Sequence, residues 1–288
     1  MNIQENIPLG NKTTMRIGGS ALFYAEISTK KDAEEAYTFA KEKDLPLITL
    51  GGGSNTIFAD KIINAFIIRI KTDEVKIDGN QITVKAGKNL PMLINELAEQ
   101  DLDLSPLTGI PGTVGGAIFG NAGQGPKGIW IDSFVEFVTA LIDGEWRTFS
   151  CAECAFSYRE SGFKKMDCPI IWEVTLNVPT KRKEEIEKTI SELLEKRIET
   201  QPHAKTSGSC FKATGDTPAW KLIEEAGLRG MKIGSIEVSD KHANFLINTD
   251  DGSFEDVSEA IEKIKKEVPD TAGVEIRLYG NDGKLVTS

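Results

Sequence analysis

Histidine and cysteine are scarce in this chain of 288 residues, which has two histidines and four cysteines. A structural zinc site takes four ligands, drawn mostly from these two residue types. Cys151 and Cys154 form a CxxC pair, but with so few histidines no second pair of ligands is evident. The flanking sequence SCAECAFSYRES is also unlike the helix start that a redox-active CxxC occupies. We therefore predict no metal site and two ordinary reduced thiols.

The commonest nucleotide-binding fingerprints are missing as well. A P-loop requires the pattern GxxxxGK[ST], which the chain lacks. A Rossmann fold requires GxGxxG between a strand and a helix, with an acidic residue placed for the ribose. The sequence LGGGSN at 50–55 follows an apolar strand, but the next residues, TIFAD, are too few and too apolar to begin a helix. These glycines therefore fit neither class.

Long hydrophobic runs are absent too. No apolar run approaches the roughly 20 residues that a membrane helix needs. The first residues, MNIQENIPLGNKTT, lack the basic and then apolar regions of a secretory signal. The formal net charge of −10 argues against a surface for nucleic acid or anionic membranes. We expect a cytoplasmic protein that binds neither.

The composition that remains, 40% hydrophobic and 27% charged, is typical of an ordinary soluble globular protein. Hydrophobic periodicity and turn residues predict a series of helices and strands. The predicted helices are 30–43, 90–100, 180–202, 217–227 and 253–268. The predicted strands are 21–28, 45–50, 65–70, 75–79, 81–87, 134–143, 145–150, 170–178, a short one around 244–248, and 273–280.

Two of these predictions are specific. Gly79-Asn80 between two short strands predicts a tight hairpin. The helix at 180–202 carries apolar residues at helical spacing, so its charges should form a solvated face rather than a nucleic-acid site. These apolar residues are Ile186, Ile190, Leu193, Leu194 and Ile198.

Glycine is concentrated in two places. The segment 105–128, SPLTGIPGTVGGAIFGNAGQGPKG, has eight glycines and three prolines, which is too many for a core element, yet it is too apolar for a linker. Backbone N–H groups that glycines leave unshielded can converge on an anion. Taken alone, LGGGSN could equally be a plain connection between strands. Together the two stretches predict one long ligand, such as a dinucleotide with a pyrophosphate.

Seven motifs stand in the order in which they occur in the UDP-N-acetylenolpyruvoylglucosamine reductase (MurB) family, and they cover essentially the whole chain. They are LGGGSN, GIPGTVGGAIFGNAG, FSYRESGFK, SGSCFK, KLIEEAGLRGMKIG, VSDKHANFLIN and GVEIRLYG. The short region after 203 resembles the compact second type of the family.

The resemblance implies an α+β protein with an FAD-binding fold of the vanillyl-alcohol-oxidase/p-cresol-methylhydroxylase kind. Its two FAD-binding subdomains would be 1–72 and 73–180, and a substrate-binding domain would be 181–288. NADPH would reduce the flavin, which would then reduce UDP-N-acetylglucosamine enolpyruvate to UDP-N-acetylmuramate, a peptidoglycan precursor. The resemblance implies a monomer whose partners are small molecules. Alternatives are another FAD oxidoreductase of this fold, or a non-catalytic relative that binds a UDP-sugar.

The resemblance also implies which residues bind FAD. Arg16, in MRIGG, would neutralise a flavin phosphate or position the FAD domain. The other implied FAD contacts are Gly51, Gly52, Gly53, Ser54, Asn55, Ile110, Pro111, Gly112, Thr113, Gly115, Gly116, Ala117, Asn121 and Gly123.

Three residues match the catalytic positions of the family. Arg159 would grip the substrate carboxylate, because a guanidinium offers two parallel hydrogen bonds and stays charged. Ser209 would donate a proton to the substrate carbon, and Glu275 would act beside the carboxylate on which charge develops. The plainer alternatives are a salt bridge from Arg159 to Glu160, a turn serine at Ser209, and a pair between Glu275 and Arg277.

Substrate contacts are implied for Tyr158, Lys212, His242 and Asn244, while Cys210 is expected only to pack nearby. One departure from the family pattern follows Lys212, where Ala213-Thr214 stands in place of Asn-Pro. The change removes a substrate contact and a rigid turn. We expect it to alter affinity rather than abolish activity.

Overall fold

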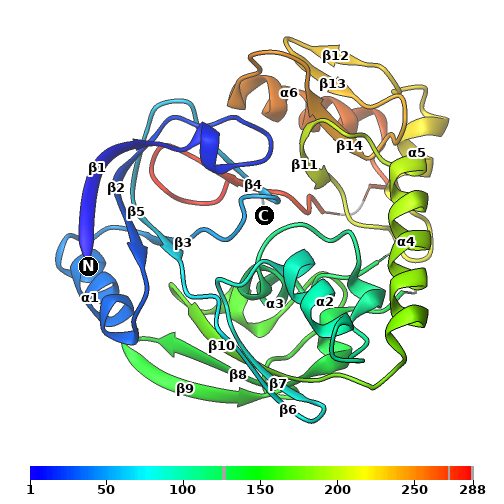
Figure 1. Cartoon of the computed structure of the whole chain (residues 1–288). Helices are drawn as coiled ribbons and strands as arrows, with labels where there is room; N and C mark the ends of the chain where they lie inside the picture. The colour runs from blue at the N-terminus through cyan, green and yellow to red at the C-terminus, as the bar shows by residue number, and fades with distance from the viewer. Residues whose placement is uncertain (125–127, 272, 287–288) are drawn as a thin grey trace. The chain divides into compact units, whose positions relative to one another are not determined.

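A computed structural model describes residues 1–124, 128–271 and 273–286 (Figure 1). Residues 125–127, within the predicted glycine-rich stretch, lie outside this part. The chain divides into two compact units. Unit 1 comprises Met1–Ile3, Ala25–Gly52 and Ile67–Arg197, and unit 2 comprises Gln4–Tyr24, Gly53–Phe66 and Ile198–Ser288. The subdomain boundaries expected from sequence stay predictions.

A four-stranded sheet has the order β1-β2-β5-β3. Its strands are β1 (Asn2–Pro8), β2 (Ser20–Ile27), β5 (Ile62–Ile70) and β3 (Leu47–Thr49). Sequence analysis did not predict β1, because its residues are mostly exposed and show no apolar alternation.

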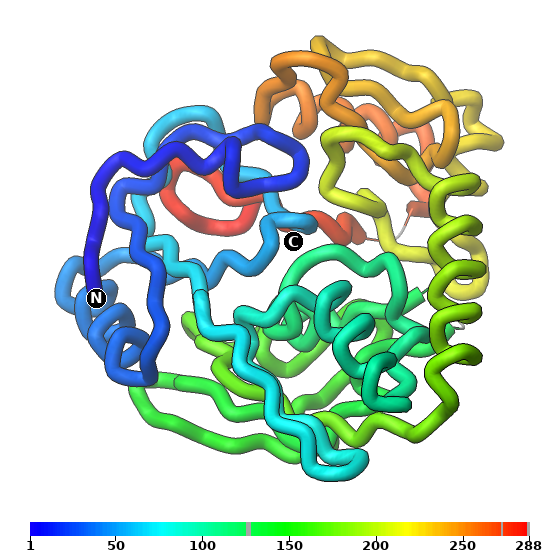
Figure 2. Tube along the Cα trace, in the orientation of Figure 1, coloured from blue at the N-terminus to red at the C-terminus, as the bar shows by residue number. Residues whose placement is uncertain are grey.

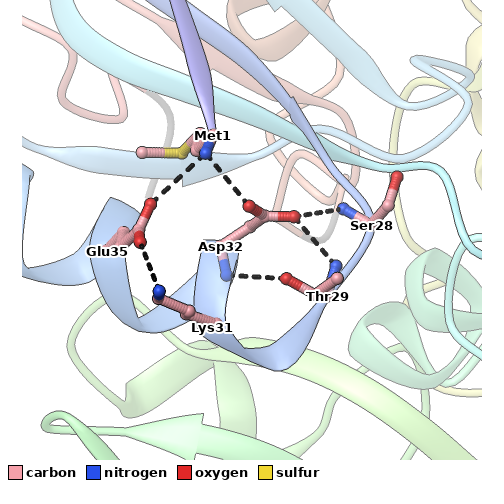
Figure 3. Close-up of polar contacts among 6 residues, drawn as sticks. All are labelled: Met1, Ser28, Thr29, Lys31, Asp32 and Glu35. Atoms are coloured by element: carbon pink, nitrogen blue, oxygen red, sulfur yellow. Dashed lines mark hydrogen bonds and ion pairs between the residues drawn. The ribbon is translucent and has the colours of Figure 1, made fainter.

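Helix α1 (Lys30–Glu42) follows β2 and matches its predicted range. Thr29 and Asp32 form a capping box, in which each side chain accepts a hydrogen bond from the other residue's backbone N–H. Asp32 also accepts from Ser28 N at 3.0 Å and lies 3.2 Å from the amino group of Met1 (Figure 3). The helix start is therefore well defined.

Unit 1 contains a five-stranded antiparallel sheet of order β6-β7-β10-β8-β9. Its strands are β6 (Val75–Asp78), β7 (Gln81–Lys85), β10 (Ile170–Asn177), β8 (Val135–Ile142) and β9 (Glu145–Ser150). Asp78 pairs with Gln81 across Gly79, whose φ is 57°, so the predicted hairpin is confirmed. Figure 1 shows α2 (Leu90–Ala98) and α3 (Val114–Gly120) on one face of the sheet.

Helix α3 corrects one expectation, because it lies inside the stretch judged too rich in glycine for a core element. Val114 and Ile118 are fully buried in the core of unit 1. Gly115 permits this packing, since a Cβ added there would lie 2.8 Å from Ala86 Cβ. Glycine here allows a short helix to approach the sheet closely rather than preventing a core element.

Unit 2 contains a four-stranded sheet of order β11-β14-β13-β12. Its strands are β11 (Lys205–Ser209), β14 (Phe245–Asn248), β13 (Ile236–Val238) and β12 (Lys232–Ile233). Helices α5 (Ala219–Glu225) and α6 (Phe254–Glu267) share a buried apolar cluster with this sheet (Figure 1). A separate parallel pair joins β4 (Thr56–Phe58) to β15 (Arg277–Tyr279). Strand β15 is shorter than the strand predicted at 273–280.

Helix α4 (Lys183–Thr200) is one unbroken stretch of the trace in Figure 2. Of its predicted apolar face, Ile186 is buried, but Leu194 and Ile198 are 42% and 53% exposed. The amphipathic pattern predicted the helix correctly but overestimated how much of its apolar face is buried.

Within the described ranges, no helix is both long and apolar enough to cross a membrane. The same residues contain no group of three or more histidine, cysteine or acidic side chains that could hold a metal ion.

Candidate functional site

The two glycine-rich stretches meet in unit 1. A Cβ added at Gly52 would lie 2.7 Å from Gly112 Cα, and one added at Gly51 would lie 2.7 Å from Thr113 Oγ1. Side chains at these positions would force the two turns apart, so glycine is required by close backbone approach. At Gly116 an added Cβ would meet only Thr113 Oγ1, at 3.4 Å. The surface formed here is therefore largely backbone, as an anion-binding turn requires.

Arg69, at the end of β5, holds the first of these turns. Its Nε and Nη2 donate to the Gly51 carbonyl oxygen at 3.1 and 2.8 Å. A trans peptide places its C=O and the following N–H on opposite sides. Anchoring the Gly51 carbonyl therefore directs the Gly52 N–H away from Arg69. Sequence analysis missed Arg69, because no motif marks it and its role follows only from the pairing of the turn with β5.

The rest of LGGGSN belongs to unit 2. The Gly53 carbonyl accepts from Thr14 N at 3.1 Å, and a Cβ added at Gly53 would lie 2.2 Å from the Lys12 carbonyl oxygen. Asn55 Nδ2 donates to the Glu275 carbonyl oxygen at 3.1 Å. The end of the glycine turn is thus tied directly to the residue predicted to be the catalytic carboxylate.

Arg16 adopts a left-handed backbone conformation, with φ of 63°, and its Nη1 donates to the Asn11 carbonyl oxygen at 2.8 Å. Such a conformation is uncommon outside glycine and often accompanies a local constraint.

Unit 2 brings Ser209 and Glu275 onto adjacent backbone segments. Phe211 pairs with Val274 in an antiparallel bridge, and Glu275 N donates to the Cys210 carbonyl oxygen at 2.8 Å. Antiparallel pairing thus places Ser209, the last residue of β11, one position along from the Cys210–Glu275 contact. These residues lie far apart in sequence, so their proximity is a result of the fold.

Asn244 braces this pair of segments. Its Oδ1 accepts from Phe211 N and its Nδ2 donates to the Phe211 carbonyl oxygen, both at 2.9 Å. The side chain is buried, so both halves of the amide are used within the protein. This structural role stands beside the predicted substrate contact of Asn244, which stays a prediction.

Cys210 is buried between these residues. Burial, and secondarily the charge of Glu275, raise the pKa of its thiol well above the usual range. A thiol held neutral is a poor nucleophile. The structure therefore agrees with the expectation that Cys210 packs rather than reacts.

In unit 1, Arg159 occupies a tight turn closed by hydrogen bonds between Ser157 and Glu160 at 3.0 and 3.1 Å. Its φ is 58°, and a left-handed arginine is a strained residue of the kind that clusters at functional sites. The turn is attached to the end of α3: Asn121 Nδ2 donates to the Ser157 carbonyl oxygen at 2.9 Å, and Ser161 Oγ donates to that of Phe119 at 2.8 Å.

The plainer interpretations of the charged residues can be compared with observed partners. Glu160 forms an ion pair with Lys164 at 3.4 Å. Arg277 donates to the Tyr279 hydroxyl at 2.8 Å from Nη2. The pairs Arg159–Glu160 and Glu275–Arg277 therefore stay alternatives.

Aromatic rings surround two of the predicted substrate contacts. Tyr158 lies 5.8 Å from Trp130 between ring centroids, and the Arg159 guanidinium lies 5.9 Å from the Tyr158 centroid. In unit 2, the ring of His242 lies 4.7 Å from that of Phe245 and 6.2 Å from that of Trp220. Lys212, the fourth predicted contact, is anchored through its N–H, which donates to the Gly273 carbonyl oxygen at 3.1 Å.

The described residues thus gather the predicted positions into two sets, one in each unit. Unit 1 holds Gly51, Gly52, Ile110, Pro111, Gly112, Thr113, Gly115, Gly116, Ala117, Asn121, Gly123, Tyr158 and Arg159, and unit 2 holds Arg16, Gly53, Ser54, Asn55, Ser209, Lys212, His242, Asn244 and Glu275.

Comparison with known proteins matches two regions of the chain to family models. Residues 21–150 match an FAD-binding domain model, and residues 201–278 match the model of the UDP-N-acetylenolpyruvoylglucosamine reductase C-terminal domain. The predicted α+β class and its FAD-binding domain are therefore confirmed.

Whole-chain relatives extend the match. The chain is 40% identical to the UDP-N-acetylenolpyruvoylglucosamine reductase of Carboxydothermus hydrogenoformans, covering 92% of this chain and 88% of the relative. The Aquifex aeolicus enzyme of that name is 35% identical, covering 97% and 96%. The crystal structure of the Thermus caldophilus enzyme superposes with a TM-score of 0.85 at 30% identity, covering 96% of this chain and 99% of that one. The chain belongs to the UDP-N-acetylenolpyruvoylglucosamine reductase (MurB) family.

Proposed function

We propose that this protein reduces UDP-N-acetylglucosamine enolpyruvate to UDP-N-acetylmuramate, with FAD as bound cofactor and NADPH as reductant. The observation that carries the proposal is the pairing of the Ser209 and Glu275 segments beside Asn55, the last residue of the glycine turn. Sequence-distant residues of the required types lie together within a family whose members bear this name.

The backbone surface at Gly51, Gly52 and Gly112 fits an FAD phosphate. Glycines have no side chain that could cover a backbone N–H, and successive N–H groups of this kind can bind an anion. Arg16 adds a cation in unit 2. Bound FAD would supply the redox chemistry, passing a hydride from NADPH to the methylene carbon of the enolpyruvyl group.

The protein's own groups then stabilise and complete the reduced substrate. Negative charge develops on the substrate carboxylate, where the fixed guanidinium of Arg159 stabilises it. Ser209 Oγ donates a proton to the neighbouring carbon, since an enolate-like carbon is basic enough to deprotonate a hydroxyl. Glu275 lies beside Ser209 along the paired segments and acts at the same carboxylate. Tyr158, Lys212 and His242 contact the UDP-sugar.

We further propose that the protein acts as a monomer in the cytoplasm and has only small-molecule partners. The acidic net charge of −10 supports the absence of nucleic acid from this set. Size-exclusion chromatography with light scattering tests the oligomeric state.

The proposal is tested by following NADPH oxidation with purified, FAD-loaded protein. Oxidation should require UDP-N-acetylglucosamine enolpyruvate and should yield UDP-N-acetylmuramate. Ser209→Ala should still bind FAD and be reduced by NADPH, but product formation should fall by at least about 100-fold, the usual contribution of a general acid. Normal turnover by Ser209→Ala would remove Ser209 from the mechanism. A wild-type protein that binds the UDP-sugar without turnover would instead be a non-catalytic relative.

A further inference from the structure

Trp130 lies outside the seven family motifs, and the reaction proposed above assigns it no role. It is half-buried and stands directly before the short helical turn Ile131–Phe134. Its backbone pairs with that of Gly123 in an antiparallel bridge. A Cβ added at Gly123 would lie 1.7 Å from Trp130 Cδ1, so only glycine leaves room for the indole ring there. The indole is therefore packed tightly against the glycine-rich stretch.

Asn121 connects this segment to the turn that carries Arg159. Its Nδ2 donates to Asp132 Oδ2 at 3.1 Å and to the Ser157 carbonyl oxygen at 2.9 Å. Its Oδ1 accepts from Asp132 N at 3.3 Å. The Asn121 side chain is buried, and a buried amide that bonds to two segments holds them in a defined position. All of these residues belong to unit 1.

The rings of Trp130 and Tyr158 and the guanidinium of Arg159 form a row. The centroids of the two rings are 5.8 Å apart, and the ring planes are tilted by 54°. The guanidinium carbon of Arg159 lies 5.9 Å from the Tyr158 centroid. Both distances lie in the ranges at which two aromatic rings, and a cation and a ring, attract each other. Each group in the row therefore restricts the position of its neighbour.

The backbone of Arg159 is held by other contacts. Lys164 Nζ donates to the Arg159 carbonyl oxygen at 2.5 Å, and hydrogen bonds between Ser157 and Glu160 close the turn. A fixed backbone still leaves a long side chain many rotamers, which are lost only against neighbouring groups. The Tyr158 ring is such a neighbour, and Trp130 packs against it. Trp130 can thus influence the guanidinium without touching it.

We infer that Trp130 is a positioning residue for Arg159, which acts by fixing the Tyr158 ring beside the guanidinium. The inference rests on the proposed function, because Arg159 is assigned there to the substrate carboxylate. A charged group that is already in place stabilises developing charge better than one that must be ordered during the reaction. Loss of Trp130 therefore weakens carboxylate binding and slows reduction of the substrate. It leaves the reduction of FAD by NADPH unchanged, because Arg159 has no part in that step.

The first test compares Trp130→Ala and Trp130→Phe with the wild type, all loaded with FAD. In Trp130→Ala, kcat for UDP-N-acetylglucosamine enolpyruvate should fall about three- to tenfold, the loss expected for one aromatic pair. The Kd of UDP-N-acetylmuramate, measured by the perturbation of flavin absorbance, should rise by a similar factor. Trp130→Phe keeps a ring and should restore most of both values. Stopped-flow reduction of the flavin by NADPH should be unchanged in both variants.

A double-mutant cycle then tests whether Trp130 acts through Arg159. Arg159→Met alone should weaken the binding of UDP-N-acetylmuramate about 10- to 100-fold, the loss of a charge-assisted contact. Adding Trp130→Ala to Arg159→Met should cause no further loss, because the group that Trp130 positions is already gone. A merely structural role would make the two losses additive.

The matched control is Trp146→Ala, which removes the same side chain from β9 in unit 1. Trp146 packs edge to face against Trp172, with ring centroids 6.0 Å apart, and its Nε1 donates to Glu34 Oε1 at 2.5 Å. Trp146→Ala should therefore keep the wild-type kcat and the wild-type affinity for UDP-N-acetylmuramate.

Three outcomes would overturn the inference. Wild-type kcat and affinity in Trp130→Ala would give Trp130 no role in the reaction. Additive losses in the cycle would assign it to folding or to a substrate contact of Tyr158 itself. Weakened FAD binding in Trp130→Ala, with unchanged affinity for UDP-N-acetylmuramate once FAD is saturating, would assign it to the glycine-rich stretch. If the wild-type protein neither binds UDP-N-acetylmuramate nor reduces the enolpyruvyl substrate, the proposed function fails instead, so the two failures are distinguishable.

Discussion

Arg69 shows how a single residue outside every motif can determine the shape of a binding turn. Its two hydrogen bonds to the Gly51 carbonyl fix the peptide that carries the Gly52 N–H. We expect Arg69→Met to weaken FAD binding about tenfold, because the turn must then be ordered by the ligand. Arg69→Lys should be intermediate, since an ammonium cannot reproduce the fork. Titration of apoprotein with FAD, followed by flavin fluorescence, measures both.

A matched control is Arg147→Met on β9. Arg147 is exposed and pairs with Glu145 at 3.2 Å, so its loss should leave FAD affinity unchanged. The same FAD affinity in Arg69→Met and wild type would show that the turn holds its shape without Arg69.

At the scale of the residue, the sequence predicts which glycines and polar residues form the site but could not show what they contact. Motif order placed Arg159, Ser209 and Glu275 by resemblance. It could not show that both halves of the Asn244 side-chain amide form hydrogen bonds with the backbone of Phe211. Such contacts join residues far apart in the chain, and local pattern contains no information about them.

At the scale of the element, helix α1 was predictable because its signals are local. The capping residues Thr29 and Asp32 are adjacent to the helix that they begin. Strand β1 and helix α3 were not predictable in this way, because β1 has little apolar pattern and α3 is built from residues of low helix propensity. Both depend on packing that forms only in the fold.

The α1 cap also makes stability depend on pH. Hydrogen bonds from Ser28 N and from Thr29 hold the pKa of Asp32 at about 2, below its usual 3.8. Because the folded state keeps this carboxylate ionised, its contribution is complete above the unfolded pKa and is lost as pH falls from about 4 to 2. Asp32→Ala should therefore cost about 1 kcal/mol at pH 7, the usual value of a cap, and roughly half as much at pH 3, which lies in the middle of this range.

Urea unfolding of the wild type and Asp32→Ala at pH 7, 4 and 3 measures this difference. Glu42→Ala, at the other end of α1, is the control, and it should change the free energy of unfolding by less than about 0.5 kcal/mol at each pH. A difference between wild type and Asp32→Ala that is as large at pH 3 as at pH 7 would rule out the ionised cap as its cause.

At the scale of the whole molecule, the rates at which the four free thiols react with a reagent report how the protein unfolds. Burial raises the pKa of Cys154 to about 12, and Cys210 is 1% exposed with a pKa also raised by burial. A pKa of about 12 instead of the ordinary 9.0 makes the thiolate fraction of Cys154 about 1,000-fold smaller at pH 8. Cys151 and Cys168 are only partly buried, so a thiol reagent should modify them first.

Cys154 belongs to unit 1 and Cys210 to unit 2, so their labelling rates follow the opening of each unit. Strands β2 and β5 contribute residues to both units, so unfolding either unit interrupts both strands. FAD at 100 times its Kd shifts the folding equilibrium about 100-fold toward the folded protein. Because the reagent reaches the two buried thiols only after unfolding, we expect their modification to slow by about 100-fold. Time-resolved labelling followed by mass spectrometry of the peptides measures the modification rate at each cysteine. Denatured protein, in which all four thiols react, is the control. Slowing of Cys154 without Cys210 would show instead that the units open independently.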